Sequence, residues 1–111
     1  MTRVLLPFPL QRAMADAIGP LLGARVRRLD WRHFPDGESL VAIEEGLDGF
    51  DVALVASLRN PDELALPLRF AAATAREFGA RSVGLVAPYL AYMRQDKRFN
   101  AGEAVSAPLF A

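Results

Sequence analysis

A run of charged and polar residues, YMRQDKRFNAGEAVS, occupies positions 92–106, shortly after the apolar segment 83–87. Arg94 carries a planar guanidinium that can stack on an aromatic base or bind phosphate oxygens, and Lys97 adds positive charge for a polyphosphate. Asp96 can anchor Arg94 or contact a hydrated magnesium ion. The alternative interpretation is a solvated loop whose charges largely compensate one another. The charge pattern alone leaves both interpretations open.

The second segment that could do chemistry is HFPDGES, at positions 33–39. Pro-Asp-Gly is a strong turn former, so Asp36 and Gly37 have a purely structural explanation. Phe34, beside this acidic turn, is also suited to stacking on a base or to burial at a subunit interface. In that case Asp36 and Glu38 can accept hydrogen bonds from an exocyclic amine or a ribose hydroxyl.

Familiar catalytic motifs are absent from the 111 residues. The sequence contains no Walker phosphate loop, no dinucleotide-binding fingerprint and no nucleophile elbow. With one histidine and no cysteine, a familiar zinc site is hard to assemble, so we predict no metal-ligating residue. His33 and Trp31 are more typical of packing or surface groups, and we assign neither a catalytic role.

Composition narrows the class of protein further. Thirteen basic residues balance thirteen acidic ones, so no overall field attracts nucleic acid or an anionic membrane. The lack of cysteine and of a signal-peptide pattern favours a cytoplasmic protein, and no apolar stretch is long enough to span a membrane. The length predicts one domain. The arginines at 25, 27, 28 and 32 fit the solvated face of a strand over 25–30.

The elements expected to position the two polar segments are short strands and one long helix. Short apolar runs at 4–6, 40–43, 52–56 and 83–87 are typical of strands buried on both faces and together predict a parallel sheet.

The long helix lies between the last two of these runs. Asn60 is its expected cap, Pro61 its first residue and Gly79 its end, while Pro67 predicts a kink or irregular first turns. Shorter helices are expected over 10–18 and from Ser106 onward.

Two motifs resemble a known family. FPDGE at 34–38 is similar to an early turn of the ribose-phosphate diphosphokinases, which make phosphoribosyl pyrophosphate. PYLAYMRQDKRFNAGEAVSAPLFA at 88–111 is similar to their PYxxYxRQD/RxFxxxExxS stretch. DVALVAS at 51–57 and the helix ahead of FGARSVGLVAPY resemble the part between. The resemblance therefore spans nearly the whole chain, in order.

The resemblance implies an α/β fold of the phosphoribosyltransferase-like type I, a three-layer sandwich with a mostly parallel sheet. Residues 1–111 would be an N-terminal domain that is truncated, with the C-terminal domain absent. The implied reaction transfers the β,γ-diphosphoryl group of ATP to ribose 5-phosphate, with Mg²⁺. Catalytic residues are expected beyond position 111, so we expect the isolated chain to be inactive.

The resemblance also implies an ATP site shared between subunits of a homo-oligomer, either a dimer or a hexamer. Lining residues from one subunit would be Arg94, Gln95, Asp96 and Lys97. Residues reaching the adenine from the neighbouring subunit would be Phe34, Asp36 and Glu38. Two alternatives remain: a non-catalytic diphosphokinase-like subunit that serves oligomerisation or regulation, and a small nucleotide-binding α/β module without phosphoribosyl chemistry.

Overall fold

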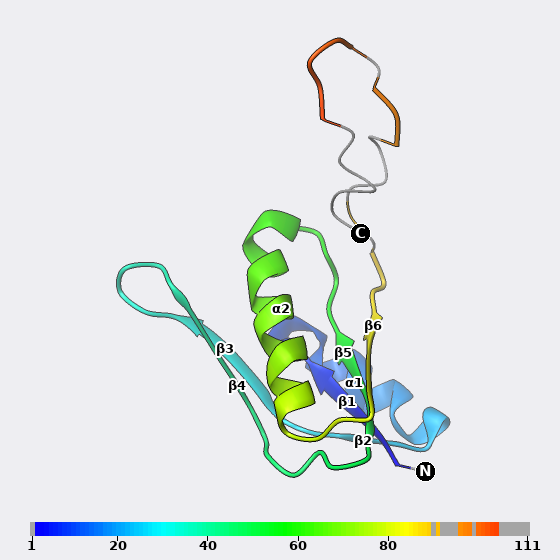
Figure 1. Cartoon of the computed structure of the whole chain (residues 1–111). Helices are drawn as coiled ribbons and strands as arrows, with labels where there is room; N and C mark the ends of the chain where they lie inside the picture. Colours follow the sequence, from blue (N-terminus) through cyan, green and yellow to red (C-terminus); the bar gives the residue numbers. More distant parts are fainter. Residues whose placement is uncertain (1, 90, 92–95, 99, 105–111) are drawn as a thin grey trace.

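The computed structural model of the chain describes residues 2–89, 91, 96–98 and 100–104. Within these residues, two α-helices separate the strands, with four consecutive strands between them (Figure 1). In chain order they are β1 (Arg3–Pro7), α1 (Arg12–Ile18), β2 (Ala24–Val26), β3 (Leu29–His33), β4 (Ser39–Ile43), β5 (Asp51–Val55), α2 (Pro61–Glu77) and β6 (Ser82–Val86). Short 3-10 helices at Pro9–Gln11 and Pro20–Leu22 flank α1.

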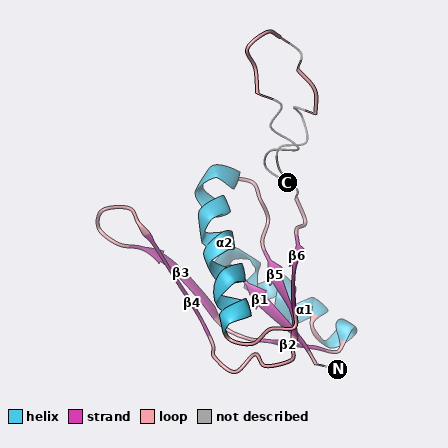
Figure 2. Ribbon diagram, in the orientation of Figure 1, coloured by secondary structure: helices cyan, strands magenta, loops and turns pink. Residues whose placement is uncertain are grey.

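Four strands form a fully parallel sheet in the order β2-β1-β5-β6. Val52 of β5 lies in register with Val4 on one side and with Val83 on the other. These strands carry three of the four apolar runs, so the predicted parallel sheet is confirmed for those runs (Figure 2).

The two faces of this sheet are covered by different helices, which makes the predicted three layers. Val4, Leu6 and Val52 share one buried cluster with Leu64 and Ala71 of α2. On the opposite face, Leu5 and Val55 share a second cluster with Ala15 of α1. The alternation along β1 follows the period of two in a strand, so neighbouring side chains serve opposite layers.

Helix α2 begins at Pro61, as predicted, and Gly79 with φ of 96° follows its end. The helix runs unbroken across Pro67, so the irregular first turns expected there are not found. The ring of Pro67 is fully buried, and this burial offsets the amide donor that proline lacks. Asn60 occupies the cap position, but its side chain makes no capping hydrogen bond.

Strands β3 and β4 form a separate antiparallel hairpin, with Trp31 opposite Val41. Two predictions are corrected by this hairpin. The run at 40–43 is not part of the parallel sheet, and the strand expected over 25–30 is split between β2 and β3. Helix α2 lies against β4, so the hairpin extends the structure beside that helix (Figure 1).

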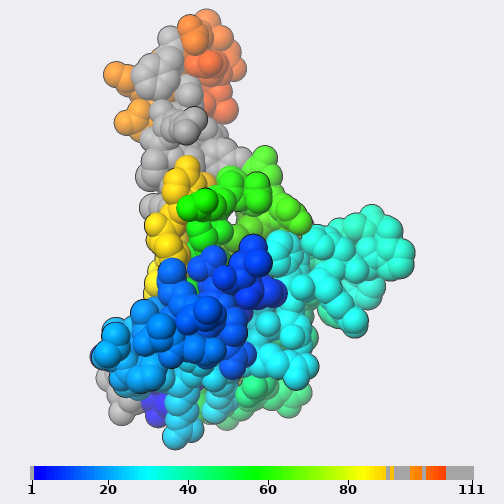
Figure 3. All heavy atoms as spheres, turned by 180° about the vertical axis from the view of Figure 1, so that it is seen from behind, coloured from blue at the N-terminus to red at the C-terminus, as the bar shows by residue number. Residues whose placement is uncertain are grey.

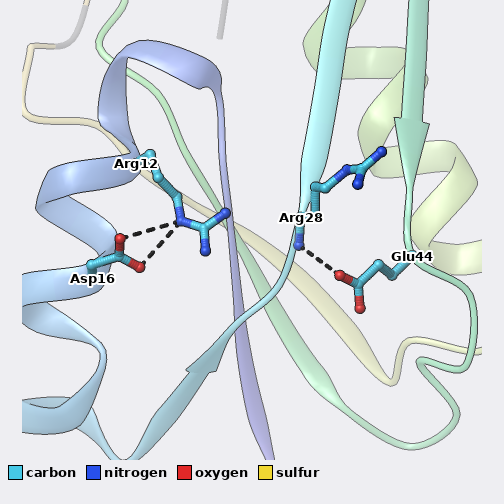
Figure 4. A network of polar contacts seen from close by, with 4 residues as sticks. All are labelled: Arg12, Asp16, Arg28 and Glu44. Carbon is cyan, nitrogen blue, oxygen red and sulfur yellow. Dashed lines mark hydrogen bonds and ion pairs between the residues drawn. The ribbon is translucent and has the colours of Figure 1, made fainter.

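Polar contacts of arginines fix the bend between β2 and β3. Arg27 places its guanidinium 5.1 Å from the ring centre of Phe50 and donates to the carbonyls of Glu45 and Gly46. The backbone amide of Arg28 donates to Glu44 Oε1 at 3.2 Å (Figure 4). Arg27 therefore anchors a loop, which corrects its expected place on a solvated strand face. These contacts hold the chain in the bend between the two strands.

Figure 4 also shows Arg12 and Asp16, one turn apart on α1, joined by Arg12 Nε at 3.2 Å from Asp16 Oδ1. This pair is exposed and spaced four residues apart, so it contributes little beyond local helix support. Within the described part of the chain, no helix is long and apolar enough to cross a membrane.

Candidate functional site

The FPDGE segment forms the tip of the β3–β4 hairpin, at the end of a two-stranded ribbon that projects from the body (Figure 1). The Phe34 amide donates to the Glu38 carbonyl at 2.7 Å, and the Gly37 amide donates to the Phe34 carbonyl at 2.9 Å. Gly37 has φ of 93°, a conformation that glycine adopts without strain. The turn predicted from Pro-Asp-Gly is confirmed.

The same turn gathers the three predicted adenine-contacting residues of the tip. Phe34 leaves 47% of its surface exposed, and both Asp36 and Glu38 are exposed. The backbone amide of Glu38 donates to Asp36 Oδ1 at 3.0 Å, and this hydrogen bond lowers the pKa of Asp36. The tip therefore presents an aromatic ring beside a carboxylate that stays ionised and accepts hydrogen bonds at neutral pH.

Side chains of β3 hold the hairpin against the rest of the structure. Trp31 packs edge-on against Phe8, with ring centres 5.6 Å apart, and its Nε1 donates to Ser39 Oγ at 3.1 Å. His33 Nε2 lies 3.8 Å from Glu63 Oε1 of α2. Because Phe8 is buried beside the sheet, these contacts connect the ribbon to the core and fix the direction in which its tip projects.

The second predicted segment is described only in part. Arg94 and Gln95 lie outside the described residues, whereas Asp96 and Lys97 are described and exposed. Farther along, Glu103 closes a turn by accepting a hydrogen bond from the Asn100 amide at 2.9 Å.

Within one chain, the hairpin tip at 34–38 and the described residues 96–98 and 100–104 do not lie together. The described part of the segment 96–104 lies beyond the carboxyl end of β6, away from the hairpin tip, in both the front and the back views (Figures 1 and 3). Contacts between the tip and the described residues Asp96 and Lys97 therefore require a second copy of the chain, or they do not form. The assignment of these residues to a nucleotide site stays a prediction.

The described residues hold no group of three or more His, Cys, Asp or Glu side chains placed to bind a metal ion. The carboxylates of Asp36 and Glu38 thus stand without a third metal-ligating side chain among these residues. Proteins usually hold Mg²⁺ by one or two carboxylates together with waters and substrate phosphates, so these two carboxylates do not complete a site by themselves.

A cavity of about 340 Å³ lies beside Trp31 of the hairpin, and none of its described lining residues belongs to either predicted segment. Its walls include Phe8 and Trp31, together with Arg59 and Glu63 from the β5–α2 region. The sequence predicts Trp31 only as a packing or surface group, and no motif indicates Arg59. The signal that could have found this site is positional, because Phe8 and Arg59 follow β1 and β5 at the carboxyl end of the sheet.

Comparison with known proteins extends the local match to the whole chain. Residues 4–111 match the family model described as the N-terminal domain of ribose phosphate pyrophosphokinase. The ribose-phosphate pyrophosphokinase of Sulfolobus acidocaldarius is 41% identical over 92 residues, which cover 82% of this chain and 32% of that protein. The enzyme of the same name from Halobacterium salinarum is 36% identical over 94% of this chain and 37% of that protein. The chain thus spans about a third of the length of these relatives.

Solved structures support the same fold. The crystal structure of phosphoribosylpyrophosphate synthetase from Mycobacterium smegmatis superimposes with a TM-score of 0.87 at 24% identity, covering 100% of this chain and 38% of that one. A purine phosphoribosyltransferase from Pyrococcus horikoshii matches with a TM-score of 0.59 at 12% identity, over 80% of this chain and 63% of that one. The fold is therefore phosphoribosyltransferase-like, and with the family model matching almost every residue, the chain belongs to the family of ribose-phosphate pyrophosphokinase N-terminal domains.

Proposed function

We propose that this chain is the N-terminal part of a ribose-phosphate diphosphokinase, which transfers diphosphate from ATP to ribose 5-phosphate. In this reaction the anomeric oxygen of the sugar forms a bond to the β-phosphorus, the bond from that phosphorus to the α-phosphate oxygen breaks, and AMP leaves. The anomeric hydroxyl gives up its proton. The chain's share of this work is to bind and orient ATP, because phosphoryl transfer depends chiefly on positioning.

The observation that carries the proposal is the exposed hairpin tip. Phe34 offers a ring for stacking on adenine, while Asp36 and Glu38 offer acceptors for its exocyclic amine or for a ribose hydroxyl. A ring and two carboxylates on one tight turn suit a base and its sugar better than they suit a polyanion. The phosphates of ATP must therefore be bound by cations from elsewhere.

We assign phosphate binding to Lys97 in a neighbouring copy, on the segment that also carries Arg94. The segment follows β6 at the carboxyl end of the sheet, where parallel α/β folds bind ligands. In this arrangement Arg94 lies against the adenine, beside Gln95 and Asp96. Because the tip and the described residues 96–98 and 100–104 lie apart within one chain, we propose that the site forms in a homo-oligomer, a dimer or a hexamer. Assembly thus becomes a condition for activity.

Magnesium is proposed to arrive with ATP, where it neutralises phosphate charge. The described residues hold no group of three or more metal-ligating side chains, and in this proposal the phosphates of ATP bind the ion. The cytoplasmic location expected from the absence of cysteine fits an enzyme that uses ATP, and it is part of the same proposal.

The test uses the full-length product of the gene that encodes this chain. The protein is incubated with ATP, Mg²⁺ and ribose 5-phosphate, and the release of AMP is measured with and without the sugar. We expect AMP release that depends on ribose 5-phosphate. The isolated 111-residue chain, tested beside it, is expected to release none.

If the full-length product assembles but releases no AMP, the proposal is wrong and a non-catalytic subunit for oligomerisation or regulation takes its place. If ATP binds but ribose 5-phosphate has no effect on the nucleotide, a nucleotide-binding module without phosphoribosyl chemistry is the better description. An oligomer that forms without the hairpin would also contradict the proposed shared site.

A further inference from the structure

The cavity of about 340 Å³ lies where this sheet changes its winding direction. After β1 the chain passes through α1 to β2, on one side of the central strand pair. After β5 it passes through α2 to β6, on the other side, and the two helices cover opposite faces of the sheet. Connections that diverge in this way leave a crevice outside the carboxyl ends of the two strands, where doubly wound folds bind ligands.

Residues on both sides of that crevice line the cavity. Phe8 and Gln11 follow β1, while Ser57 and Asn60 follow β5. The hairpin closes one side by contributing Trp31. The volume lies within the range of small-molecule sites and is large enough for one ring compound.

The walls are mainly apolar and aromatic. Phe8 and Leu64 are buried core residues, and Trp31 is half-buried with its ring against Phe8. The indole Nε1 of Trp31 already donates to Ser39, so the ring offers apolar surface to the cavity rather than a hydrogen-bond donor. Such walls favour a planar ring, because aromatic surfaces stack and exclude water.

The charged groups on the lining are one cation and one anion, Arg59 and Glu63. Glu63 Oε1 lies 3.8 Å from His33 Nε2, which places this carboxylate next to the hairpin. Arg59 forms no ion pair with the other described residues and stands just before α2, whose amino terminus adds partial positive charge. No side chain caps that end of the helix. The first turn of α2 also carries Asp62 and Glu63, which offset part of this charge, so Arg59 itself is the group on the β5 side that can pair with an anion.

We propose that this cavity binds a small planar aromatic compound that carries one anionic group. The ring lies between the aromatic wall and Leu64, and the anion is bound by Arg59 at the amino terminus of α2. Gln11 and Asn60 supply amides that can donate to, or accept from, polar atoms on the ring. The anion comes either from a carboxylate or from a phosphate, because a guanidinium pairs with both.

The described residues of the proposed ATP site do not line this cavity. Its lining contains neither the hairpin-tip residues Phe34, Asp36 and Glu38 nor the described residues Asp96 and Lys97. Substitutions of these described residues can therefore be tested separately from substitutions of the cavity residues. Failure of the diphosphokinase proposal would leave this inference standing, and the reverse also holds.

Trp31 provides the experiment, because it is the single tryptophan of the chain and lines the cavity. The purified 111-residue chain is titrated with phenylacetate and with AMP while tryptophan fluorescence is recorded. The uncharged partners, phenylacetamide and adenosine, are titrated in the same way. We expect at least one of the two anions to give a saturable change, with its uncharged partner binding about tenfold more weakly.

Three variants locate the binding. Arg59→Gln is expected to weaken binding of the anion about tenfold, while Arg69→Gln, an exposed arginine of α2 outside the cavity, leaves it unchanged. Phe34→Ala is the third variant and tests whether AMP binds at the hairpin tip instead, because the tip does not line the cavity. Far-ultraviolet circular dichroism confirms that each variant is folded.

Saturation by phenylacetate identifies a carboxylate ligand, and saturation by AMP alone identifies a phosphate ligand. Either result supports the proposal when it is lost in Arg59→Gln. Absence of saturation with every probe overturns it. So does equal binding of the charged and uncharged partners, or AMP binding that depends on Phe34 and not on Arg59.

Discussion

Arg81 and Asp51 form a two-pronged ion pair at the amino ends of β5 and β6. Arg81 Nη2 lies 2.6 Å from Asp51 Oδ2, and Arg81 Nε donates to Oδ1 at 3.0 Å. Ser82 Oγ also donates to Oδ1, at 2.6 Å. These hydrogen bonds from Arg81 and Ser82 lower the pKa of Asp51 to about 2. The pair therefore joins the amino ends of two strands that lie side by side in the sheet.

The pH dependence of stability should report this pair. Because the pKa of Asp51 falls from 3.8 to about 2 on folding, its stabilising effect is complete above pH 3.8 and is lost as the pH falls towards 2. We expect Asp51→Asn to lower the melting temperature by no more than a few degrees at neutral pH, since the Arg81 side chain is 55% exposed, and the difference should shrink between pH 4 and pH 2. Asp16→Asn, in the exposed helical pair, is the control. An unchanged difference across this pH range would contradict the assignment.

Gly79 should be more sensitive to substitution than other glycines in left-handed conformations. Its φ is 96°, and an added Cβ would overlap the side chain of Asp48 and approach Asp48 Cα at 2.9 Å. Gly49 has φ of 74° with open space around it, so Gly49→Ala serves as a matched control for conformational strain alone. We expect Gly49→Ala to cost about 1–2 kcal/mol. Gly79→Ala should cost at least about 1 kcal/mol more. Urea unfolding measures both, and equal costs would show that the close approach is unimportant.

The hairpin should depend on Trp31 for its attachment. Trp31→Ala removes the edge-on contact with Phe8 and the hydrogen bond to Ser39, and because the indole is only half-buried we expect a loss of about 2 kcal/mol. Ser39→Ala removes only the hydrogen bond, at a cost of about 1 kcal/mol or less. Urea unfolding followed by circular dichroism distinguishes the two. Similar losses would mean that the ring contact adds little.

Phe34 should matter for activity and hardly at all for stability. The ring is 47% exposed, so Phe34→Ala is expected to change the free energy of unfolding by less than about 0.5 kcal/mol. Loss of stacking on adenine should nevertheless raise the KM for ATP about tenfold in the full-length protein. A large change in stability would reassign Phe34 to a structural role.

A shared site should also show complementation. Full-length Arg94→Ala is expected to fold normally and to use ATP about tenfold less well, because it loses a stacked cation. Mixed oligomers of Phe34→Ala and Arg94→Ala subunits contain some sites with both residues intact, so activity should partly recover. Mixing either variant with more of itself is the control. No recovery would argue that each site lies within one chain.

The local features of the chain were decided by its sequence. The short apolar runs predict β1, β5 and β6, because strands buried on both faces need apolar residues at successive positions. Pro61 and Gly79 set the limits of α2 through backbone constraints that depend on neighbouring residues only. The turn at 34–38 follows from Pro-Asp-Gly in the same way. The motifs on these elements were sufficient to indicate the family.

Tertiary structure alone decided which strands pair and which distant residues meet. The run at 40–43 has the composition of a sheet strand, yet β4 pairs only with β3, because pairing depends on contacts far apart in sequence. The cavity likewise joins Phe8, Trp31 and Arg59 from three separate segments, and no local pattern relates them. Its position follows from the strand order β2-β1-β5-β6, which places the ends of β1 and β5 side by side. Strand order is a property of long-range packing, and for that reason it was not visible in the sequence.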